Sequence, residues 1–267
     1  MELQEPAPAK INLALHVRGK LSDGRHRLET IFAFCTDGDR VTARPADELS
    51  LEVEGSFAGD LGDAEDNLAL KAARALQAHA GAHEGASLTL TKKLPVASGI
   101  GGGSADAAAV LRLLTRMWAI DPSHASAVAP GLGADVPACL LSMSVRGDGA
   151  GDELTPVDAG VRDTPILLVN PRIELSTSDV FSAWNGEDKG PLGDWRAGRN
   201  DLEEAAVKQV PLIGAVLAWL SVQPGANFVR MSGSGATCFA LFDSEQARDA
   251  AEVAVPREWW RLATYLR

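Results

Sequence analysis

The sequence predicts a mixed α+β protein of two domains, with a boundary near residue 158. Segments with the period-two apolar alternation of β-strands occur in both halves of the chain, and segments with helical periodicity lie between them. Their order lacks the strict strand–helix repeat of a doubly wound parallel sheet. A length of 267 residues accommodates one or two folding units of roughly 100–200 residues each. We therefore expect domains over residues 1–158 and 159–267.

The N-terminal half begins with a predicted antiparallel pair of strands. Residues 10–17 alternate strictly, which places Lys10 and Asn12 on one face and apolar side chains on the other. Asp23-Gly24 predicts a turn, and residues 28–34 predict a second strand that ends in a turn at residues 37–39.

Two helices and a short strand are predicted next. Residues 67–80 carry apolar side chains at helical spacing, and Gly81 follows as a stop signal. Residues 88–91 alternate again and predict a strand. Beyond a glycine-rich run, a second helix is expected to end near Asp121-Pro122, because the residue before a proline disfavours the helical conformation.

The C-terminal half mixes strands and helices in the same way. Residues 165–169 form a continuous apolar strand, the polar residues 185–198 indicate a loop, and residues 201–221 predict a helix. Two further strands are expected over residues 228–232 and 237–242, and Ser244 is a typical start of a last helix.

Composition argues against several classes of protein. The net charge is −11 and no basic cluster is present, so nucleic acid is a poor candidate partner. No apolar stretch approaches the roughly 20 residues that cross a bilayer, and the first residues lack the pattern of a secretory signal, which predicts a cytoplasmic protein without a membrane partner. The three cysteines are widely spaced in apolar surroundings, so we expect reduced core residues.

The glycine-rich run at residues 95–105 predicts a phosphate-binding loop. Four glycines occupy five positions, 99–103, directly before a helix, where free N–H groups and the helix dipole attract an anion. A flexible linker or a tight turn is the alternative interpretation. A Walker A loop is excluded because no lysine follows the glycines, and a dinucleotide fingerprint is excluded because Ser104 replaces its third glycine. Asp106 is read as a carboxylate that complements the helix dipole rather than as a catalytic group.

Three ordered motifs together resemble the GHMP kinases, named for galacto-, homoserine, mevalonate and phosphomevalonate kinases. The motifs are Pro8-Ala9-Lys10-Ile11-Asn12-Leu13, the glycine-rich loop with the residues after it, and Met231-Ser232-Gly233-Ser234-Gly235-Ala236-Thr237-Cys238. Within that superfamily, the sequence resembles the diphosphocytidyl-methylerythritol kinases at Asp23-Gly24-x-His26, Asp66-Asn67-Leu68, Lys93-Leu94-Pro95 and Gly133-Ala134-Asp135-Val136-Pro137. The resemblance implies a ribosomal-protein-S5-like N-terminal domain and a ferredoxin-like C-terminal domain, with the active site in the cleft between them.

The resemblance also implies roles for particular residues. Asp135 would be the catalytic base and Lys10 its cationic partner, and Asn12, His26, Thr177 and Phe181 would contact the acceptor, His26 at its cytosine. The ATP loop would consist of Pro95, Val96, Ala97, Ser98, Gly99, Ile100, Gly101, Gly102, Gly103, Ser104 and Ala105. Mg²⁺ is expected to accompany ATP because it neutralises phosphate oxygens during transfer. No protein ligand of the metal is assigned, since Ser104 fits that role and the role of a helix cap equally well.

Each of these residues also has an ordinary structural interpretation. Outside its motif, Asp135 would be a loop carboxylate and Lys10 a solvated strand lysine. Phe181 fits core packing as well as a substrate pocket. Lys92 and Lys93 could approach ATP, but a bare lysine pair more often forms a solvated strand end.

One departure from the family pattern affects the acceptor. Arg25 stands where many members carry a tyrosine that stacks on the cytosine, although a guanidinium can also stack on an aromatic face. The expected activity is ATP-dependent phosphorylation of the 2-hydroxyl of a cytidine diphosphate-linked methylerythritol in isoprenoid synthesis. The alternatives are a GHMP kinase for another small alcohol and an inactive nucleotide-binding regulatory protein. No pattern in the sequence sets an oligomeric state.

Overall fold

The computed structural model describes residues 2–267, and the chain folds into two compact units built from interleaved segments. The first unit contains the residues up to Ala9, Asp37–Val96 and Gly101–Ser142. The second contains Lys10–Thr36, Ala97–Ile100 and Met143–Arg267. The predicted mixture of helices and strands is confirmed in both units. Each unit therefore combines parts of the chain that lie far apart in the sequence.

Two long strands, β1 (Leu3–Lys20) and β2 (His26–Ala46), contribute residues to both units. They pair with each other, and only five residues connect them, so the pair is antiparallel as predicted. The turn expected at residues 37–39 is wrong, because β2 continues to Ala46. A Cβ atom on Gly38 would lie 2.1 Å from the carbonyl oxygen of Ala7. The glycine therefore permits a close approach of β1 rather than a turn.

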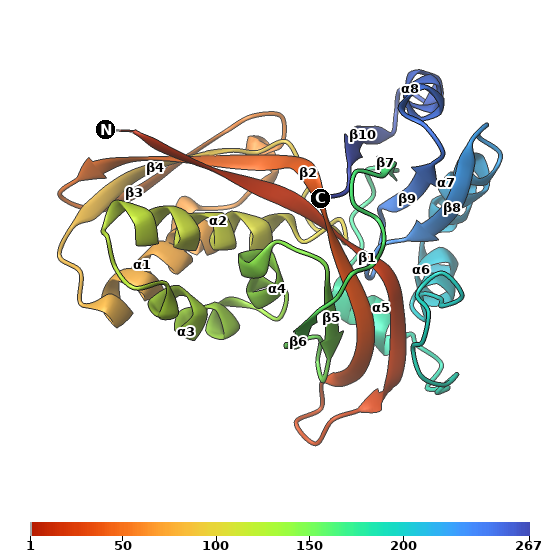
Figure 1. The fold of residues 1–267 in the computed structure, drawn as a ribbon, viewed down its shortest axis with the longest axis horizontal. Coiled ribbons are helices and arrows are strands. Elements are labelled where there is room, and N and C mark those ends of the chain that lie inside the picture. The colour runs from red at the N-terminus through yellow and green to blue at the C-terminus, as the bar shows by residue number, and fades with distance from the viewer. Residues whose placement is uncertain (1) are drawn as a thin grey trace. The chain divides into compact units, whose positions relative to one another are not determined.

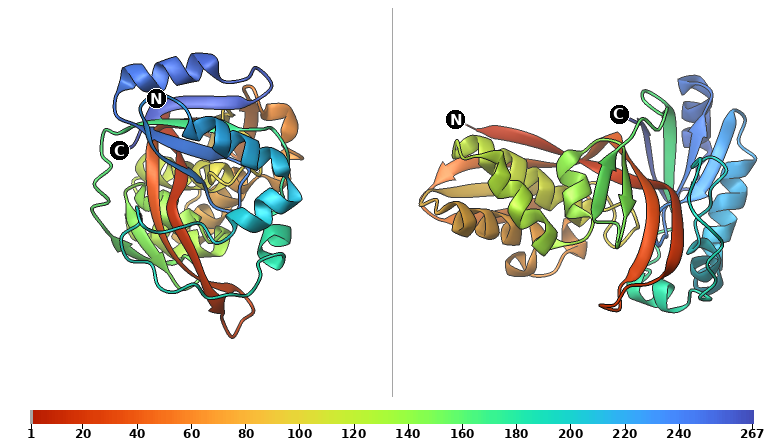
Figure 2. Two further views of the ribbon diagram at one scale, coloured as in Figure 1. Left: turned by 90° about the vertical axis from the view of Figure 1, so that its right-hand side faces the viewer. Right: turned by 60° about the horizontal axis from the view of Figure 1, so that its bottom comes forward.

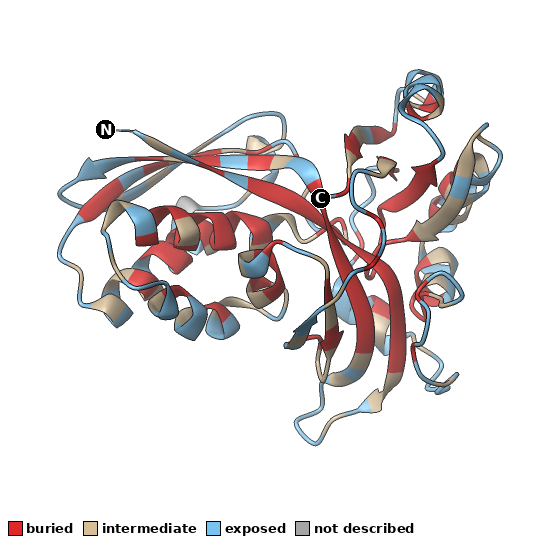
Figure 3. Ribbon diagram, viewed as in Figure 1, coloured by how far each residue is buried: buried red, intermediate tan, exposed pale blue. Residues whose placement is uncertain are grey.

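The first unit places helices on one face of its strands (Figure 1). The later part of β2 pairs antiparallel with β4 (Gly85–Thr91), which pairs in parallel with β3 (Leu49–Glu54). The helices are α1 (Leu68–Ala80), α2 (Gly102–Met117), α3 (Pro122–Leu132) and α4 (Val136–Leu141), with two short 3₁₀ turns at Ala58–Asp60 and Ala64–Asp66. Helix α2 is buried along most of its length and forms the centre of this unit (Figure 3).

Local capping explains where the helices of the first unit begin and end. The side chain of Asn67 accepts a hydrogen bond from the N–H of Ala69, and Gly81 adopts the left-handed conformation that ends α1, which confirms the predicted helix. Helix α2 ends at Met117, before the predicted stop. Asp121 instead begins the next helix, because its carboxylate accepts the N–H of Ser123 at 2.8 Å.

The second unit contains a four-stranded antiparallel sheet in the order β10-β7-β9-β8. Its strands are β7 (Pro165–Asn170), β8 (Ala226–Met231), β9 (Cys238–Phe242) and β10 (Trp260–Tyr265). Helices α7 (Pro211–Ser221) and α8 (Glu245–Ala254) share one apolar core with β7 and β9, so they cover the same face of the sheet (Figure 2). This β-α-β-β-α-β order and strand arrangement are those of a ferredoxin-like domain.

Further short strands and helices belong to the second unit. Strand β5 (Val145–Asp148) pairs antiparallel with β2 and with β6 (Glu153–Pro156). The expected helix over residues 201–221 is interrupted, giving α6 (Glu203–Gln209) and α7, because Pro211 lacks the N–H that a continuous helix would need. The loop predicted at residues 185–198 is confirmed, and α5 (Thr177–Ser182) precedes it.

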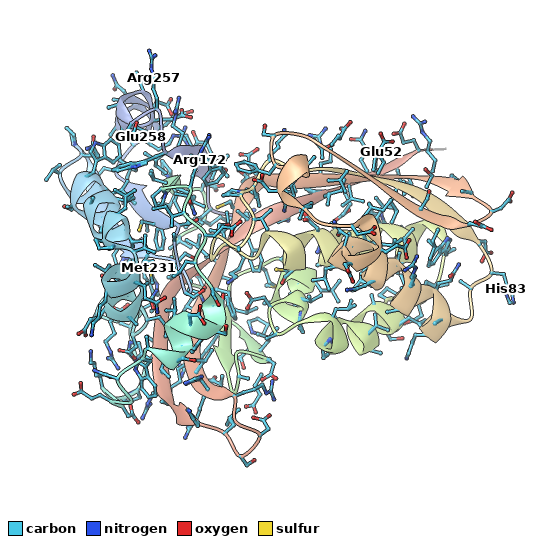
Figure 4. The ribbon with its side chains drawn as sticks, turned by 180° about the vertical axis from the view of Figure 1, so that it is seen from behind. Glu52, His83, Arg172, Met231, Arg257 and Glu258 are labelled. Atoms are coloured by element: carbon cyan, nitrogen blue, oxygen red, sulfur yellow. The ribbon has the colours of Figure 1, made fainter. Side chains whose placement is uncertain are left out.

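Burial separates the interior from the surface as the composition predicts. Met231, at the end of β8, is fully buried, whereas Arg257 and Glu258 project outward from the turn before β10 (Figure 4). Cys35, Cys139 and Cys238 are all buried, which confirms that these cysteines are core residues. Within residues 2–267, no helix has both the length and the apolar character needed to cross a membrane.

Candidate active site

In the second unit, residues 97–100 of the glycine-rich loop are bound by their backbone to the segment between β8 and β9. The carbonyl oxygen of Ser98 accepts the N–H of Thr237 at 3.1 Å, and that of Gly99 accepts the hydroxyl of Ser232 at 2.9 Å. A Cβ atom on Gly99 would lie 2.6 Å from the carbonyl oxygens of Ser232 and Gly235, and its φ is +75°. Glycine is therefore required here by protein packing alone.

The same loop is bound to the start of the chain. The N–H of Lys10 donates to the carbonyl oxygen of Ile100 at 2.9 Å, and the N–H of Asn12 donates to Oγ of Ser232 at 3.1 Å. Residues from all three sequence motifs thus meet in this unit. This proximity could not be read from the spacing of the motifs along the chain.

Lys10 and Asn12 form a buried polar pair on β1. Nζ of Lys10 donates to Oδ1 of Asn12 at 3.1 Å and lies 5.2 Å from the ring centre of Phe32. Nδ2 of Asn12 donates to Oγ1 of Thr30 at 2.8 Å. The predicted placement of both residues on one face of the strand is confirmed. Lys10 is only 3% exposed, so its interpretation as a solvated strand lysine is wrong.

His26 packs against two aromatic side chains from α5 and the residues after it. Its ring centre lies 4.8 Å from that of Phe181 and 5.8 Å from that of Trp184, with Trp184 edge-on. Burial and, to a lesser degree, the charge of Lys20 lower the pKa of His26, so its ring is neutral at neutral pH. Trp184 was not anticipated from the sequence, although it follows Phe181 by three positions, a spacing at which helical side chains become neighbours.

Thr177, on α5, and Arg25, between β1 and β2, are each held by polar contacts. Oγ1 of Thr177 forms a hydrogen bond of 2.9 Å with Oγ of Ser234, which links α5 to the segment between β8 and β9. The guanidinium of Arg25 donates to Asp23 at 2.8 Å and to Asp152 at 2.9 Å. These bonds, that to Asp23 first, raise the pKa of Arg25. Its half-exposed side chain is therefore held by two carboxylates, a contact that a tyrosine could not reproduce.

In the first unit, Asp135 occupies the position before α4. Its carbonyl oxygen accepts the N–H of Cys139 at 3.0 Å, and its side chain is half-buried. The far end of α4 is bound by Arg112 of α2, whose Nη1 donates to the carbonyl oxygen of Cys139 at 2.7 Å, while its Nε donates to Glu5. Arg112 belongs to none of the sequence motifs, and only the structure reveals that it supports the helix that follows Asp135.

The start of α2 corrects two readings of the loop. Gly101, with φ of +65°, is the N-terminal cap of α2, so Ser104 lies inside the helix and is not its cap. Asp106 lies beyond the first turn of α2, which contains no acidic residue, and its carboxylate instead accepts a hydrogen bond from Lys92, so the predicted role of complementing the helix dipole is wrong. Lys92 is buried as well, and the interpretation of the lysine pair as a solvated strand end holds only for Lys93.

The comparisons with known proteins agree with this fold and with these motifs. The chain matches the family model described as "GHMP kinases N terminal domain" over residues 67–143 and the one described as "GHMP kinases C terminal" over residues 187–261. Together with the two-unit α+β architecture and the glycine-rich loop, these matches define the class of protein. The chain belongs to the GHMP kinases, with the expected S5-like and ferredoxin-like domains.

Relatives at high identity narrow the class further. Proteins from Novosphingobium aromaticivorans and Rhizorhabdus wittichii, both named 4-diphosphocytidyl-2-C-methyl-D-erythritol kinase, are 52% and 53% identical to this chain; they cover all of it, and the matches span 94% and 96% of the relatives. A crystal structure of 4-(cytidine 5'-diphospho)-2C-methyl-D-erythritol kinase superposes with a TM-score of 0.85 at 31% identity, covering 100% of this chain and 99% of the other. Within the GHMP kinases, the chain belongs to the 4-diphosphocytidyl-2-C-methyl-D-erythritol kinase family.

Proposed function

We propose that this protein transfers the γ-phosphoryl group of ATP to the 2-hydroxyl of 4-diphosphocytidyl-2-C-methyl-D-erythritol, a step of the non-mevalonate isoprenoid pathway. The observation that carries this proposal is identity above 50% over the whole chain to relatives that bear this name. In the reaction, the acceptor oxygen forms a bond to the γ-phosphorus, the bond from that phosphorus to the bridging oxygen of ADP breaks, and the hydroxyl proton passes to a base.

Residues 95–105 are the proposed ATP loop. The carbonyl oxygens of Ser98, Gly99 and Ile100 accept hydrogen bonds from other parts of the second unit, which holds this backbone in one conformation. In the first unit, the N–H groups at the first turn of α2 have no partner within the helix, because a helix leaves its first N–H groups unbonded. Such groups bind phosphate oxygens and also gain from the helix dipole.

Asp135 and Lys10 are the proposed base and cation. A carboxylate can accept the proton of an attacking hydroxyl, and an ammonium group can stabilise negative charge on the transferring phosphoryl group. Burial of Lys10 beside Asn12 fixes the position of its ammonium group, which a solvated lysine would not achieve. This restriction supports a role in catalysis rather than in solubility.

The acceptor's cytosine is proposed to contact His26 and Phe181. The lowered pKa of His26 keeps its ring neutral, so one ring nitrogen can donate a hydrogen bond to the cytosine and the other can accept one. Asn12 and Thr177 are the proposed polar contacts to the rest of the acceptor. Thr177 is exposed on α5, and its hydroxyl forms a hydrogen bond with that of Ser234.

Mg²⁺ is proposed to arrive with ATP rather than in a site formed by protein ligands alone. In the part of the chain that the structure describes, no three His, Cys, Asp or Glu side chains form a group that could hold a metal ion. Mg²⁺ usually binds one or two protein ligands together with substrate phosphates, so an ion that arrives with ATP does not require three protein ligands. When bound, the ion neutralises charge on the phosphate oxygens. Ser104, in the first turn of α2, is the proposed protein ligand.

A coupled assay for ADP release tests the proposed function. The assay contains Mg-ATP with one acceptor at a time: diphosphocytidyl-methylerythritol, mevalonate, homoserine or galactose. Strong turnover with the cytidine compound alone is the expected result. Turnover with another acceptor would keep the class and reject the proposed substrate. ATP binding without turnover of any acceptor would favour a nucleotide-binding protein that has lost catalysis.

A further inference from the structure

A buried ion cluster lies directly beside the start of α2, in the first unit. It consists of Lys92, which follows β4, Asp39 of β2 and Asp106 of α2. Nζ of Lys92 donates to Oδ2 of Asp106 at 2.9 Å and also donates to Oδ2 of Asp39. Each of the three residues is 2% exposed. A buried cluster of charges costs desolvation energy, so its presence beside a functional loop calls for a reason.

The ion cluster connects the residues before the glycine-rich loop with those after it. Oδ1 of Asp39 accepts the N–H groups of Lys93 and Leu94, at 2.5 and 2.8 Å, directly before Pro95. Asp106 lies in the first turns of α2, just beyond Ala105. Lys92 joins the two carboxylates, so both ends of the loop are fixed to a single ammonium group.

The ion cluster also lies against the loop backbone. A Cβ atom on Gly102 would lie 2.9 Å from Nζ of Lys92 and 3.8 Å from Oδ2 of Asp39. Nζ normally moves with ease, but here two carboxylates hold it in place. Gly102 has no positive φ that would require glycine. The absence of a side chain at this position is therefore explained by the ammonium group beside it.

Burial and the neighbouring charges together set the pKa values of Asp106 and Lys92 in the ion cluster. Burial raises the pKa of Asp106 to about 7, which the Lys92 ammonium opposes and the Asp39 carboxylate reinforces. Burial acts to lower the pKa of Lys92, but the carboxylates of Asp106 and Asp39 outweigh it and leave that pKa raised. Among the described residues, Oδ1 of Asp106 is buried without a hydrogen-bond partner. The raised pKa of Lys92 means that its ammonium group stays charged beside Asp39 and Asp106.

We propose that Lys92, Asp39 and Asp106 are positioning residues for the ATP loop, which they hold at both ends so that the first N–H groups of α2 face the phosphates. The proposal rests on the assignment of residues 95–105 to ATP. None of the three side chains needs to touch the nucleotide, because they act through the backbone of Lys93, Leu94 and Gly102. Their loss should therefore weaken the binding of ATP and leave the binding of the acceptor unchanged.

The first test is direct titration of a non-hydrolysable ATP analogue by calorimetry, without acceptor. Lys92→Met should weaken binding about tenfold, since a misplaced binding group of this kind has effects of that order or larger. The KM for the acceptor at saturating ATP should stay within about twofold of the wild-type value. Arg116→Gln is the matched control: it removes an ion pair to Glu5 from the same helix, far from the loop, and should leave nucleotide affinity unchanged.

A second variant, Gly102→Ala, keeps the inference testable if Lys92→Met folds poorly, and a double-mutant cycle of the two is measured where both fold. If the role of the ion cluster is purely structural, Gly102→Ala should lower the melting temperature, because the new methyl group displaces Nζ of Lys92, and should leave nucleotide affinity unchanged. The proposal predicts weaker binding, because the new methyl group displaces Nζ of Lys92. In the Lys92→Met background the same substitution should have little further effect, whereas a direct clash with phosphate would give additive losses.

The outcomes separate this inference from the proposed function. If the wild-type protein and the variants bind the analogue equally well, the inference is overturned and the kinase assignment stays intact. Equal losses for nucleotide and acceptor, or additive effects in the cycle, would also overturn it. If the wild-type protein binds no nucleotide, the loop assignment fails and the inference fails with it. A selective, non-additive loss of nucleotide affinity supports it.

Discussion

The N–H of Asn12 donates a hydrogen bond of 3.1 Å to Oγ of Ser232, although the two residues are 220 positions apart in the sequence. The same hydroxyl donates to the carbonyl oxygen of Gly99. One side chain therefore joins the strand that carries Lys10, the glycine-rich loop and the turn after β8. All of these groups belong to the second unit, so Ser232 links them within one compact unit.

Replacing Ser232 with alanine should destabilise the second unit. The substitution leaves the N–H of Asn12 and the carbonyl oxygen of Gly99 unpaired in a buried place, which costs about 1–3 kcal/mol for each unsatisfied group. Denaturant unfolding measures the loss. Ser221→Ala is the control, because that hydroxyl donates to Ala218 on an exposed part of α7 and should matter little. Equal stability of the two variants would show that Ser232 does not join these segments.

Replacing Asp135 with asparagine should slow turnover without loss of the nucleotide. We expect kcat to fall by about 10²–10⁴-fold, the usual range for loss of a general base, with ATP affinity nearly intact. Steady-state kinetics and titration with ATP measure the two quantities separately. Asp163→Asn is a suitable control, because Asp163 is exposed and asparagine tolerates its positive φ. Unchanged turnover by the Asp135 variant would remove this residue from the role of base.

Replacing Phe181 with alanine should raise the KM for the acceptor and leave the KM for ATP unchanged. The ring lies against His26, so its loss removes an aromatic surface worth about 1–3 kcal/mol to a stacked base. Arg25→Ala provides the comparison. Its guanidinium is bound to Asp23 and Asp152 at an exposed site, where such pairs are worth roughly 0–1 kcal/mol, so a small effect is expected. A larger effect of Arg25→Ala would instead indicate that the guanidinium stacks on the cytosine.

The pH dependence of stability should report on Asp106. Its pKa rises from 3.8 to about 7 on folding, so the folded chain binds this proton more strongly than the unfolded chain does. The stabilisation of the folded state by this bound proton is fully present below pH 3.8, and it is lost as the pH rises toward 7. Asp106→Asn cannot ionise, so its free energy of unfolding should improve relative to wild type between pH 5 and pH 8.

Denaturant unfolding of both proteins at these two pH values measures that change. The lowered pKa values of His16 and His26 act in the same range, but both proteins contain these residues, so their contributions cancel in the comparison. The raised pKa of Lys92 affects stability only above pH 10.5. A constant difference between the two proteins across the range would show that Asp106 titrates normally.

Local signals predicted most helices and strands, because caps, prolines and alternation act over a few residues. Helix α1 begins after Asn67 and ends before Gly81 as expected, and Ser244 caps α8. The errors have local causes of the same kind. Pro211 divides a predicted helix, and Gly38 resembles a turn residue although it lies within a strand against β1. The boundary near residue 158 stays a prediction, since the compact units interleave along the chain.

The candidate site was harder to predict, since its contacts join distant parts of the sequence. The motifs identified Lys10, Asn12 and the glycine-rich loop, but not the hydroxyl of Ser232 that connects them. The sequence also did not reveal which of the charged side chains are buried. The sequence predicts Lys92 in a solvated strand end and Asp106 as a carboxylate at the start of a helix, and only the packing of β2, β4 and α2 reveals them as an ion cluster. The roles of the predicted site residues in catalysis and binding stay predictions.

The interleaving of the two units has a consequence for synthesis on the ribosome. The second unit needs residues 10–36 as well as β10, the last strand of its sheet to be made. The early segment, which includes the apolar first part of β2, must therefore wait for almost the whole chain before it can be buried. Contacts of such long sequence separation form slowly, and exposed strands aggregate meanwhile. Substitutions that increase the apolar surface of residues 10–36 should reduce the yield of folded protein even where they leave the finished fold unchanged.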